Sequence, residues 1–272
     1  MQGISKFLKN AAKQAKLNPE LDVFGSGNMQ RLVEAVKLTP HYQWQIRDVA
    51  GVLYSLSCLR KQMSNKAEAA LVAELLSYMT GVISSSTKPF NAIDLSQSFF
   101  GLRKLSDTFS EVRALLSALA SKVRECRKPL DAQAVGNALY GLQGCSSDSA
   151  EVREVLSALA AKVRECREPL DAQAVGNALY GLQGKDMCPE LHELVGLLRQ
   201  RALDVMGGPA LEKLSQLPCS ELISLQQVFR LLPGDDSVVV AFDGSSKGEF
   251  ARISTRLEEE LKLRQARGEP LH

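Results

Sequence analysis

A fifteen-residue segment occurs twice in this chain without a difference, and it constrains the fold more than any other feature. Residues 130–144 read Leu-Asp-Ala-Gln-Ala-Val-Gly-Asn-Ala-Leu-Tyr-Gly-Leu-Gln-Gly, and residues 170–184 repeat them forty positions later. The match continues upstream, so that residues 111–144 and 151–184 differ only at positions 114, 115, 121 and 128 of the first copy. A fixed period of this length indicates supersecondary units that stack in series.

The first half of each unit is predicted to be a helix with one apolar stripe. Asp131 is a good N-cap, and Gly144 is a typical residue at which a helix ends. At helical spacing, the apolar residues of this first helix fall on one side. They are Val135, Ala138, Leu139 and Leu142.

The second half is predicted to be another helix, packed against the first. It should begin at Asp148, with Glu151 completing a capping box, as Thr108 and Glu111 do in the preceding copy. It should end near Arg167. Its apolar stripe consists of Val152, Val155, Leu156, Leu159, Val163 and Cys166.

Older copies become visible when the chain is aligned at the same offset. One position is always aromatic, at Tyr54, Phe100, Tyr140 and Tyr180, and another is always small, at Ala50, Ser96, Gly136 and Gly176. Because glycine inside a helix costs about 1 kcal/mol relative to alanine, we expect a neighbouring backbone to pass close to the two glycines. Phe229 is a candidate for the aromatic position of a degenerate last copy.

These patterns predict an all-α protein, an α-solenoid of helix-turn-helix repeats with a period of about 40 residues. The composition agrees, because 272 residues with 45% hydrophobic and only 6% aromatic side chains can bury a large, aliphatic core. We expect a basic N-terminal segment over residues 1–25, the repeat array over residues 26–235 and a C-terminal capping segment over residues 236–272. The last segment contains a possible short strand, Val238–Phe242, and a final amphipathic helix.

The N-terminal segment carries lysines and no acidic residue before position 20. Four of them share one helical face: Lys6, Lys9, Lys13 and Lys16. Three interpretations stay open from the sequence. The segment is an arm that contacts phosphates, an organelle-targeting helix, or a solvated helix that packs on a partner.

Residues that could carry catalysis are sparse. None of the three histidines lies at a ligand or triad spacing from a cysteine or an acid, and the sequence has no HExxH motif and no phosphate-binding loop. The six cysteines form no CxxC pair, so we expect buried free thiols. No apolar run reaches the length of a membrane span. The sequence therefore predicts a non-enzymatic protein without a cofactor, a metal site or a membrane span.

The far side of each first helix carries amides beside the aromatic position. Gln133, Asn137 and Tyr140 lie within about 60° of one another and roughly 150° from the apolar stripe. The corresponding residues are Gln173, Asn177 and Tyr180 in the second copy, Ile93, Gln97 and Phe100 before it, and Arg47, Gly51 and Tyr54 in the earliest one. A ring that stacks on a base, beside amides that bond the base edge, is a means of reading single-stranded RNA. Alternatively, the amides form a polar ladder between successive first helices, and the rings pack the repeats together.

The second helices carry a repeated arginine stripe. Its members return to one helical face, and they are Arg113, Arg124, Arg127, Arg153, Arg164 and Arg167. Stacked in series, they would form a surface for phosphates or for a carboxylate-rich partner. Alternatively, the neighbouring glutamates convert them into a solvated, salt-bridged face.

The units over Asn91–Leu102 and Asp131–Leu142 resemble the organellar octotricopeptide and heptatricopeptide repeat families, which are often linked to RAP domains in algae and alveolates. The resemblance covers about residues 28–184. It implies an α-solenoid that binds RNA in a mitochondrion or plastid, for transcript maturation or within an organellar ribosome. The chain departs from these families, because its unit is longer, its array is short, and its C-terminus has no recognisable RAP domain.

The leading hypothesis from the sequence is a helical-repeat protein that binds RNA or a ribonucleoprotein in an organelle. The rings would stack on bases, the amides would read their edges, and the arginines would contact phosphates. The alternative is a structural scaffold subunit whose concave surface holds a helix or tail of a protein partner in a large organellar complex. Outside an organelle, the expected location is the cytoplasm.

Overall fold

The computed structural model describes residues 28–59, 66–103, 105–206 and 245–268, together with Asn10, Lys13 and Leu17. Within these residues every regular element is helical, so the predicted all-α class is confirmed. The elements of the array are α2 (Asn28–Lys37), η2 (His41–Gln43), α3 (Ile46–Leu59), α4 (Lys66–Ser85), α5 (Ala92–Leu102), α6 (Ser110–Glu125), α7 (Ala132–Tyr140), α8 (Ala150–Glu165), α9 (Ala172–Leu182) and α10 (Pro189–Met206). They are followed by α13 (Ser245–Ala266).

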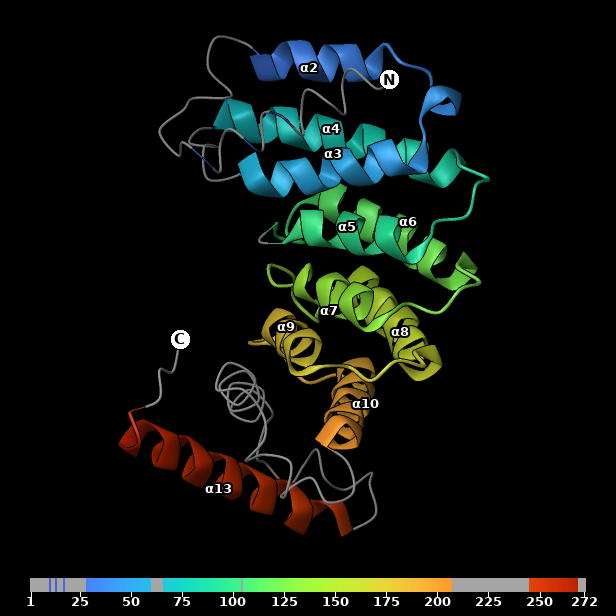
Figure 1. Cartoon of the computed structure of the whole chain (residues 1–272). Coiled ribbons are helices and arrows are strands. Elements are labelled where there is room, and N and C mark those ends of the chain that lie inside the picture. Colours follow the sequence, from blue (N-terminus) through green and yellow to red (C-terminus); the bar gives the residue numbers. More distant parts are fainter. Residues whose placement is uncertain are drawn as a thin grey trace.

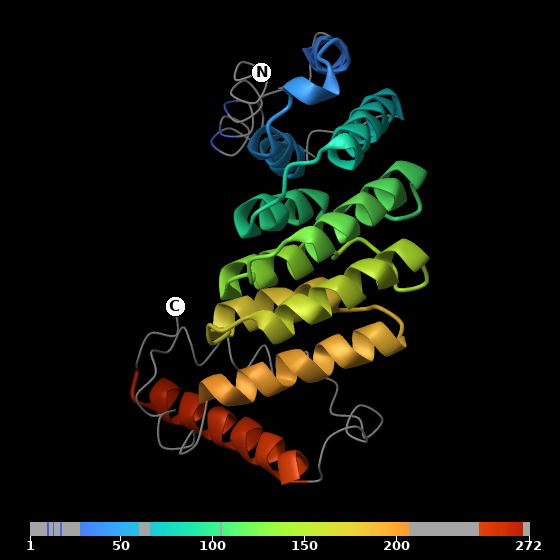
Figure 2. The same ribbon diagram turned by 90° about the vertical axis from the view of Figure 1, so that its right-hand side faces the viewer.

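The helices form two layers that run in series along the molecule (Figure 1). The first-helix layer contains α3, α5, α7 and α9, and each of these packs on the next. The second-helix layer contains α2, α4, α6, α8 and α10, which pack in the same serial way. Figure 2 shows the layers stepping down the molecule in parallel. This is the solenoid arrangement that the forty-residue period predicts.

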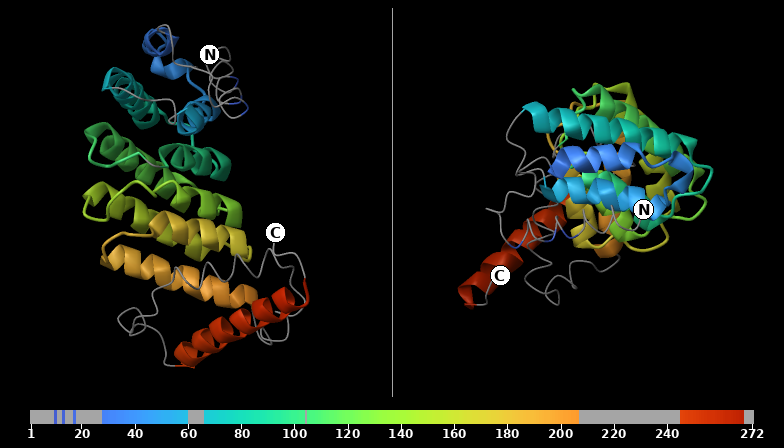
Figure 3. Two further views of the ribbon diagram at one scale, coloured as in Figure 1. Left: turned by 90° about the vertical axis from the view of Figure 1, so that its left-hand side faces the viewer. Right: turned by 90° about the horizontal axis from the view of Figure 1, so that it is seen from above.

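The last helix, α13, lies beyond α10 at the C-terminal end of the array, and the view from above shows it projecting to one side (Figure 3). Leu257 and Leu261 on this helix are buried. Several predicted features fall outside the described residues. These are most of the basic segment 1–25, the aromatic position at Phe229, and the possible strand Val238–Phe242.

Three of the first helices, α5, α7 and α9, begin where the sequence predicts, because a side chain caps each of them. The carboxylates of Asp131 and Asp171 accept the backbone N–H of Ala134 and Ala174, both at 2.7 Å. Asn91 occupies the same position in α5, and Asp94 completes a capping box there. The ends differ from the prediction. Helix α7 ends at Tyr140 rather than Gly144, and the chain continues in tight turns through residue 144.

The second helices begin later than predicted, and the two capping boxes do not form. The N-caps of α6 and α8 are Phe109 and Ser149, without a capping side-chain bond, rather than Thr108 and Asp148. The reason is a serine turn just upstream. The hydroxyl of Ser146 accepts the N–H of Asp148 at 3.1 Å, and Ser106 does the same for Thr108. These local bonds hold Thr108 and Asp148 in a turn, and each N-cap lies one residue later than predicted.

The predicted apolar stripes form the core. All four residues of the first predicted stripe, Leu142 included, and all six of the second, Cys166 included, are at most 2% exposed. The core cluster is continuous from α2 through α10, so the repeats are not separate globules. Among the described helices, none combines the length and the apolar character that crossing a membrane requires.

Glycines set how closely the first helices approach one another. A Cβ on Gly136 would lie 2.8 Å from the carbonyl oxygen of Ala174, so the predicted close approach is confirmed there. A second position is tighter. At Gly101, Gly141 and Gly181, a methyl group would overlap the backbone of the preceding first helix, at Leu53, Phe99 and Leu139 respectively.

We expect Gly141→Ala to destabilise the protein strongly. Helix propensity alone would favour alanine by about 1 kcal/mol, but the overlap with the Phe99 carbonyl should force α5 and α7 apart at a net cost of about 3 kcal/mol. Urea unfolding followed by circular dichroism measures the change. Gln133→Ala, on an exposed site of the same helix, is the control and should lie close to wild type. An alanine variant at 141 that is as stable as this control would contradict the close approach.

Candidate functional site

The four aromatic residues of the first helices form one continuous stack, called here the ring stack. The ring centroids of Tyr54 and Phe100 are 5.6 Å apart, those of Phe100 and Tyr140 are 5.5 Å apart, and those of Tyr140 and Tyr180 are 5.6 Å apart. Neighbouring ring planes are inclined by only 18–20°. The first three side chains are half-buried, and Tyr180 is 43% exposed.

The glycines explain why these rings meet. Gly101, Gly141 and Gly181 each follow a ring residue directly, and each packs on the residue that precedes the ring of the previous helix. Without a Cβ at these positions, successive first helices come close enough for their rings to stack. The ring stack and the glycine contacts are therefore one device that repeats from helix to helix.

The stack limits what a ligand can reach. Phe100 and Tyr140 each stack on a neighbouring ring on either side, with centroids 5.5–5.6 Å apart, and the guanidinium of Arg103 lies over the Phe100 ring, 4.5 Å from its centroid. These neighbours occupy much of the ring surface that a stacking base would need. The rings pack the repeats together, as in one of the two alternatives that the sequence left open.

The amides beside the stack vary in exposure along one side of the first-helix layer. Gln133 and Gln173 are exposed, whereas Gln97, Asn137 and Asn177 are half-buried. We call these five residues the amide face. Of the earlier residues at the same slots, Ile93 and Arg47 are exposed and Gly51 is buried. Arg47 is the one charged residue among these slots.

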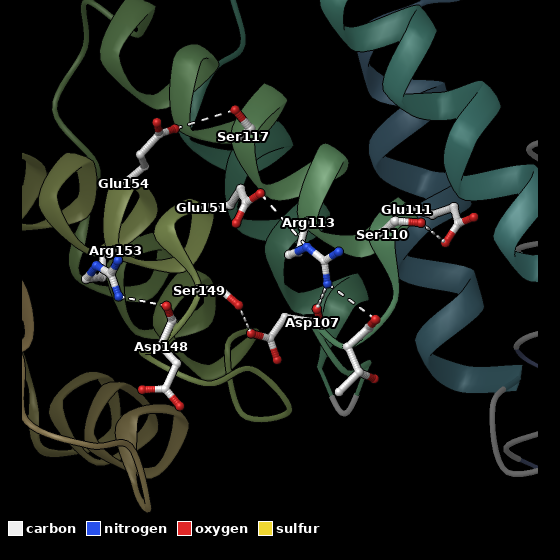
Figure 4. A network of polar contacts seen from close by, with 11 residues as sticks. Asp107, Ser110, Glu111, Arg113, Ser117, Asp148, Ser149, Glu151, Arg153 and Glu154 are labelled. Carbon is white, nitrogen blue, oxygen red and sulfur yellow. Dashed lines mark hydrogen bonds and ion pairs between the residues drawn. The ribbon is translucent and has the colours of Figure 1, made fainter.

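Two of the six predicted phosphate contacts hold loops of their own repeat. Arg113 donates to the carbonyl oxygens of Asp107 at 2.6 Å and Thr108 at 3.3 Å. Arg153 repeats the arrangement one unit later. It donates to the carbonyl oxygens of Ser147 at 2.9 Å and of Asp148 at 2.8 Å, the second of which is visible in Figure 4. Both side chains are half-buried.

Three of the six arginines, Arg113 among them, also pair with glutamates of the following second helix. Arg113 lies 3.9 Å from Glu151 (Figure 4). Arg124 lies 3.7 Å from Glu154. Arg164 on α8 forms the same kind of pair with Glu193 on α10. The remaining two, Arg127 and Arg167, are exposed in the loops that follow α6 and α8. For the paired arginines, this is the salt-bridged face that the sequence left open as an alternative.

Buried cations join the second helices, and the sequence analysis did not single them out. Lys162 donates through Nζ to the carbonyl oxygen of Cys126, at the end of α6, and to Glu165, both at 2.7 Å. Lys122 makes the equivalent bonds to Ser86 at 2.9 Å and Glu125 at 2.7 Å. Both lysines are at most 6% exposed. The sequence did contain a signal for these contacts, because each lysine lies within an apolar stripe about one turn before the end of its helix.

Arg201 on α10 continues this series. Its guanidinium donates to the carbonyl oxygens of Val163, Arg164 and Cys166, at 3.0–3.3 Å. A cation at the negative end of a helix dipole is favourable, and it also satisfies carbonyls that lack a helical partner. Each second helix from α6 to α10 therefore binds the C-terminal end of the one before it.

Polar contacts also link the loops between the two helices of successive units. Buried Asp107 accepts the N–H of Ser146 at 3.0 Å and the hydroxyl of Ser149 (Figure 4). Lys185 donates to the carbonyls of Leu142 and Cys145. Burial lowers the pKa of Lys185, and burial raises the pKa of Cys145 to about 12. No group of histidine, cysteine and acidic side chains in the described residues is arranged to hold a metal.

We expect Lys162→Met to destabilise the array by about 1–3 kcal/mol, because it leaves the buried Cys126 carbonyl without its donor. Urea unfolding measures this cost. Arg124→Met is the matched control, since its exposed pair with Glu154 should contribute less than about 1 kcal/mol. Equal losses in the two variants would show that the buried lysine does not stabilise the joint between α6 and α8.

We expect the thiol of Cys145 to resist alkylation in the folded protein. With a pKa of about 12, only about one molecule in 10⁴ carries the reactive thiolate at pH 8. Peptide mass spectrometry after brief iodoacetamide treatment should find Cys145 unmodified in the native protein and fully modified in 8 M urea. Rapid native labelling at this residue would contradict its burial.

Comparison with known proteins identified no relative of this chain. Searches against models of protein families, against curated proteins and against solved structures each found no match to the chain. The chain's own residues, their contacts and the resemblance of its repeats are therefore the grounds for assigning a function.

Proposed function

We propose that this chain is a non-enzymatic helical-repeat scaffold that binds an extended segment of a protein partner along the amide face. The observation that carries the proposal is the ring stack with the amides beside it. The rings pack against one another from repeat to repeat, while amides from three successive first helices line the adjacent surface.

Amide side chains are suited to binding a polypeptide backbone. Each offers a carbonyl acceptor and an NH₂ donor, which complement the N–H and C=O of a peptide group. Gln133 and Gln173 are exposed at equivalent positions of α7 and α9, and Asn137 and Asn177 lie one turn further along each helix. An extended segment that crosses these helices would meet the same pair of amides at each step.

The distribution of charge also favours a protein ligand over a polyanion. Three of the six stripe arginines pair with glutamates of the next second helix, and Arg153 binds its own loop. Arg113, one of the paired residues, also binds its loop. A strand of RNA needs a series of uncompensated cations beside its phosphates. The amide face itself carries no formal charge.

The resemblance of the repeats to organellar families suggests where such a scaffold would act. We propose a mitochondrion or plastid as the compartment, and a large assembly there as the setting. Imaging of the chain with a C-terminal fluorescent tag tests the compartment. A diffuse cytoplasmic signal would oppose it without bearing on the binding surface.

Selection from a random peptide display library tests the proposed ligand class. Peptides enriched on the wild-type protein should bind at least tenfold more weakly to the double variant Asn137→Ser, Asn177→Ser, because each lost amide contact is worth about 1 kcal/mol. Fluorescence anisotropy measures the affinities. Ser157→Ala, on the exposed side of α8, is the control and should bind like wild type.

Tyrosine-to-alanine variants are less useful here, because each ring also stabilises its neighbours by about 0.5–1.5 kcal/mol. Tyr140→Phe is the sharper change, since Phe100 already occupies this position in the preceding repeat. It removes only the hydroxyl at the ring edge. If neither the serine double variant nor Tyr140→Phe changes peptide affinity, the amide face is not the binding surface.

RNA binding is the second candidate, and the exposed arginines Arg127 and Arg167 favour it. They lie in the loops that lead directly into α7 and α9, beside the helix ends that carry Gln133 and Gln173. A randomised pool of single-stranded RNA should then bind with an affinity that falls steeply with salt. RNA affinity that depends on Asn137 and Asn177, with no peptide enriched, would replace the scaffold proposal by this one.

A further inference from the structure

A groove lies at the loop edge of the array, between the loop that precedes α5 and the end of α6. Its volume is about 920 Å³. The loop before α5 contributes Thr87, Pro89, Phe90 and Asn91 to its lining, and the end of α6 with the loop after it contributes residues 124–128. We call it the loop groove. It is formed by different residues from the amide face.

The groove combines a cationic rim with an apolar floor. Arg124, Arg127 and Lys128 are exposed, whereas Phe90 and Cys126 are only 2% exposed beneath them. The single carboxylate of the lining, Glu125, is bound to the buried ammonium of Lys122 at 2.7 Å. Arg124 lies 3.7 Å from Glu154. Arg127 and Lys128 are the two other cations of the lining, and within the described residues neither forms a salt bridge.

The differences between the two nearly identical copies single out this groove. The copies differ at four positions, and one of them is Lys128, which corresponds to Glu168. Asn91 likewise corresponds to Asp131 and Asp171 in the following repeats. One unit further along, the same loop edge thus carries carboxylates at positions where the loop groove has an ammonium and a neutral amide. Arg124 and Arg127 recur as Arg164 and Arg167, but Lys128 does not, so the excess of positive over negative charge is largest at this repeat.

We propose that the loop groove binds a short acidic peptide segment of a protein partner, with carboxylates at Arg127 and Lys128 and an aliphatic side chain over the exposed ring of Pro89. Guanidinium and ammonium groups on an apolar floor complement alternating acidic and aliphatic residues. An RNA strand running along the array would leave this groove and meet Glu168 and Asp171 at the next loop. A short peptide is confined to the positive repeat.

The copies themselves supply the test variants. Lys128→Glu introduces the residue that the next repeat carries at the same position, so the loop conformation should be retained. Arg127→Ala removes the second cation. Arg167→Ala is the matched control, because Arg167 is the counterpart of Arg127 one unit later and does not line the groove.

The probe is a fluorescein-labelled twelve-residue peptide of alternating glutamate and leucine, measured by anisotropy at 50 and 150 mM NaCl. We expect Lys128→Glu to weaken binding at least tenfold, Arg127→Ala to weaken it severalfold, and Arg167→Ala to leave it unchanged. A peptide of alternating lysine and leucine should not bind. Circular dichroism confirms that each variant is folded.

Three results would overturn the proposal. One is equal peptide affinity in wild type and Lys128→Glu, and another is loss of affinity in Arg167→Ala to the same degree as in Arg127→Ala. The third is binding of a twelve-nucleotide single-stranded RNA that depends on Lys128 while the acidic peptide does not bind. The serine double variant of the amide face should bind the acidic peptide like wild type, so the two proposals fail separately.

Discussion

The fold depends on the close approach of successive first helices at glycine. Gly101, Gly141 and Gly181 each lie against the backbone of the preceding first helix, where any side chain would overlap it. That spacing brings the aromatic residues into one stack and fixes which of their surfaces a ligand can reach. The second helices are joined differently, through buried lysines that bind the carbonyl end of the helix before. Small residues thus hold one layer together, and long charged residues hold the other.

Much of the fold could be predicted from the sequence, because a forty-residue period and amphipathic stripes are local signals. The helix order, the buried stripes and the caps at Asp131 and Asp171 followed directly from them. The starts of α6 and α8 could not be predicted in the same way. Asp148 and Thr108 look like N-caps, but their backbone N–H groups donate to the hydroxyls of serines two residues earlier, which holds them in a turn. A capping box and a serine turn are both compatible with these residues, and the sequence alone does not show which of the two forms.

The candidate surface was harder to predict than the fold. Helical geometry placed Gln133, Asn137 and Tyr140 on one side of a first helix, but it could not show that rings from different repeats would meet. The distance between repeats decides that contact, and it depends on glycines whose importance appears only once the neighbouring backbone is in place. The partners of the arginines were hidden for the same reason. Arg124 and Glu154 are thirty positions apart in the chain and adjacent only when the units stack.

The contacts between units share one further property, which is that they run between corresponding places in consecutive copies. Lys122 reaches the end of α4 as Lys162 reaches the end of α6, and Gly141 lies against α5 as Gly181 lies against α7. A unit duplicated in tandem would therefore bind the carbonyl end of the preceding unit through its lysine, and its own carbonyl end would bind the lysine of the following unit. Such an array can lengthen by one step without any new complementary surface having to arise. Two adjacent segments that differ at only four positions are what growth by this route would leave behind.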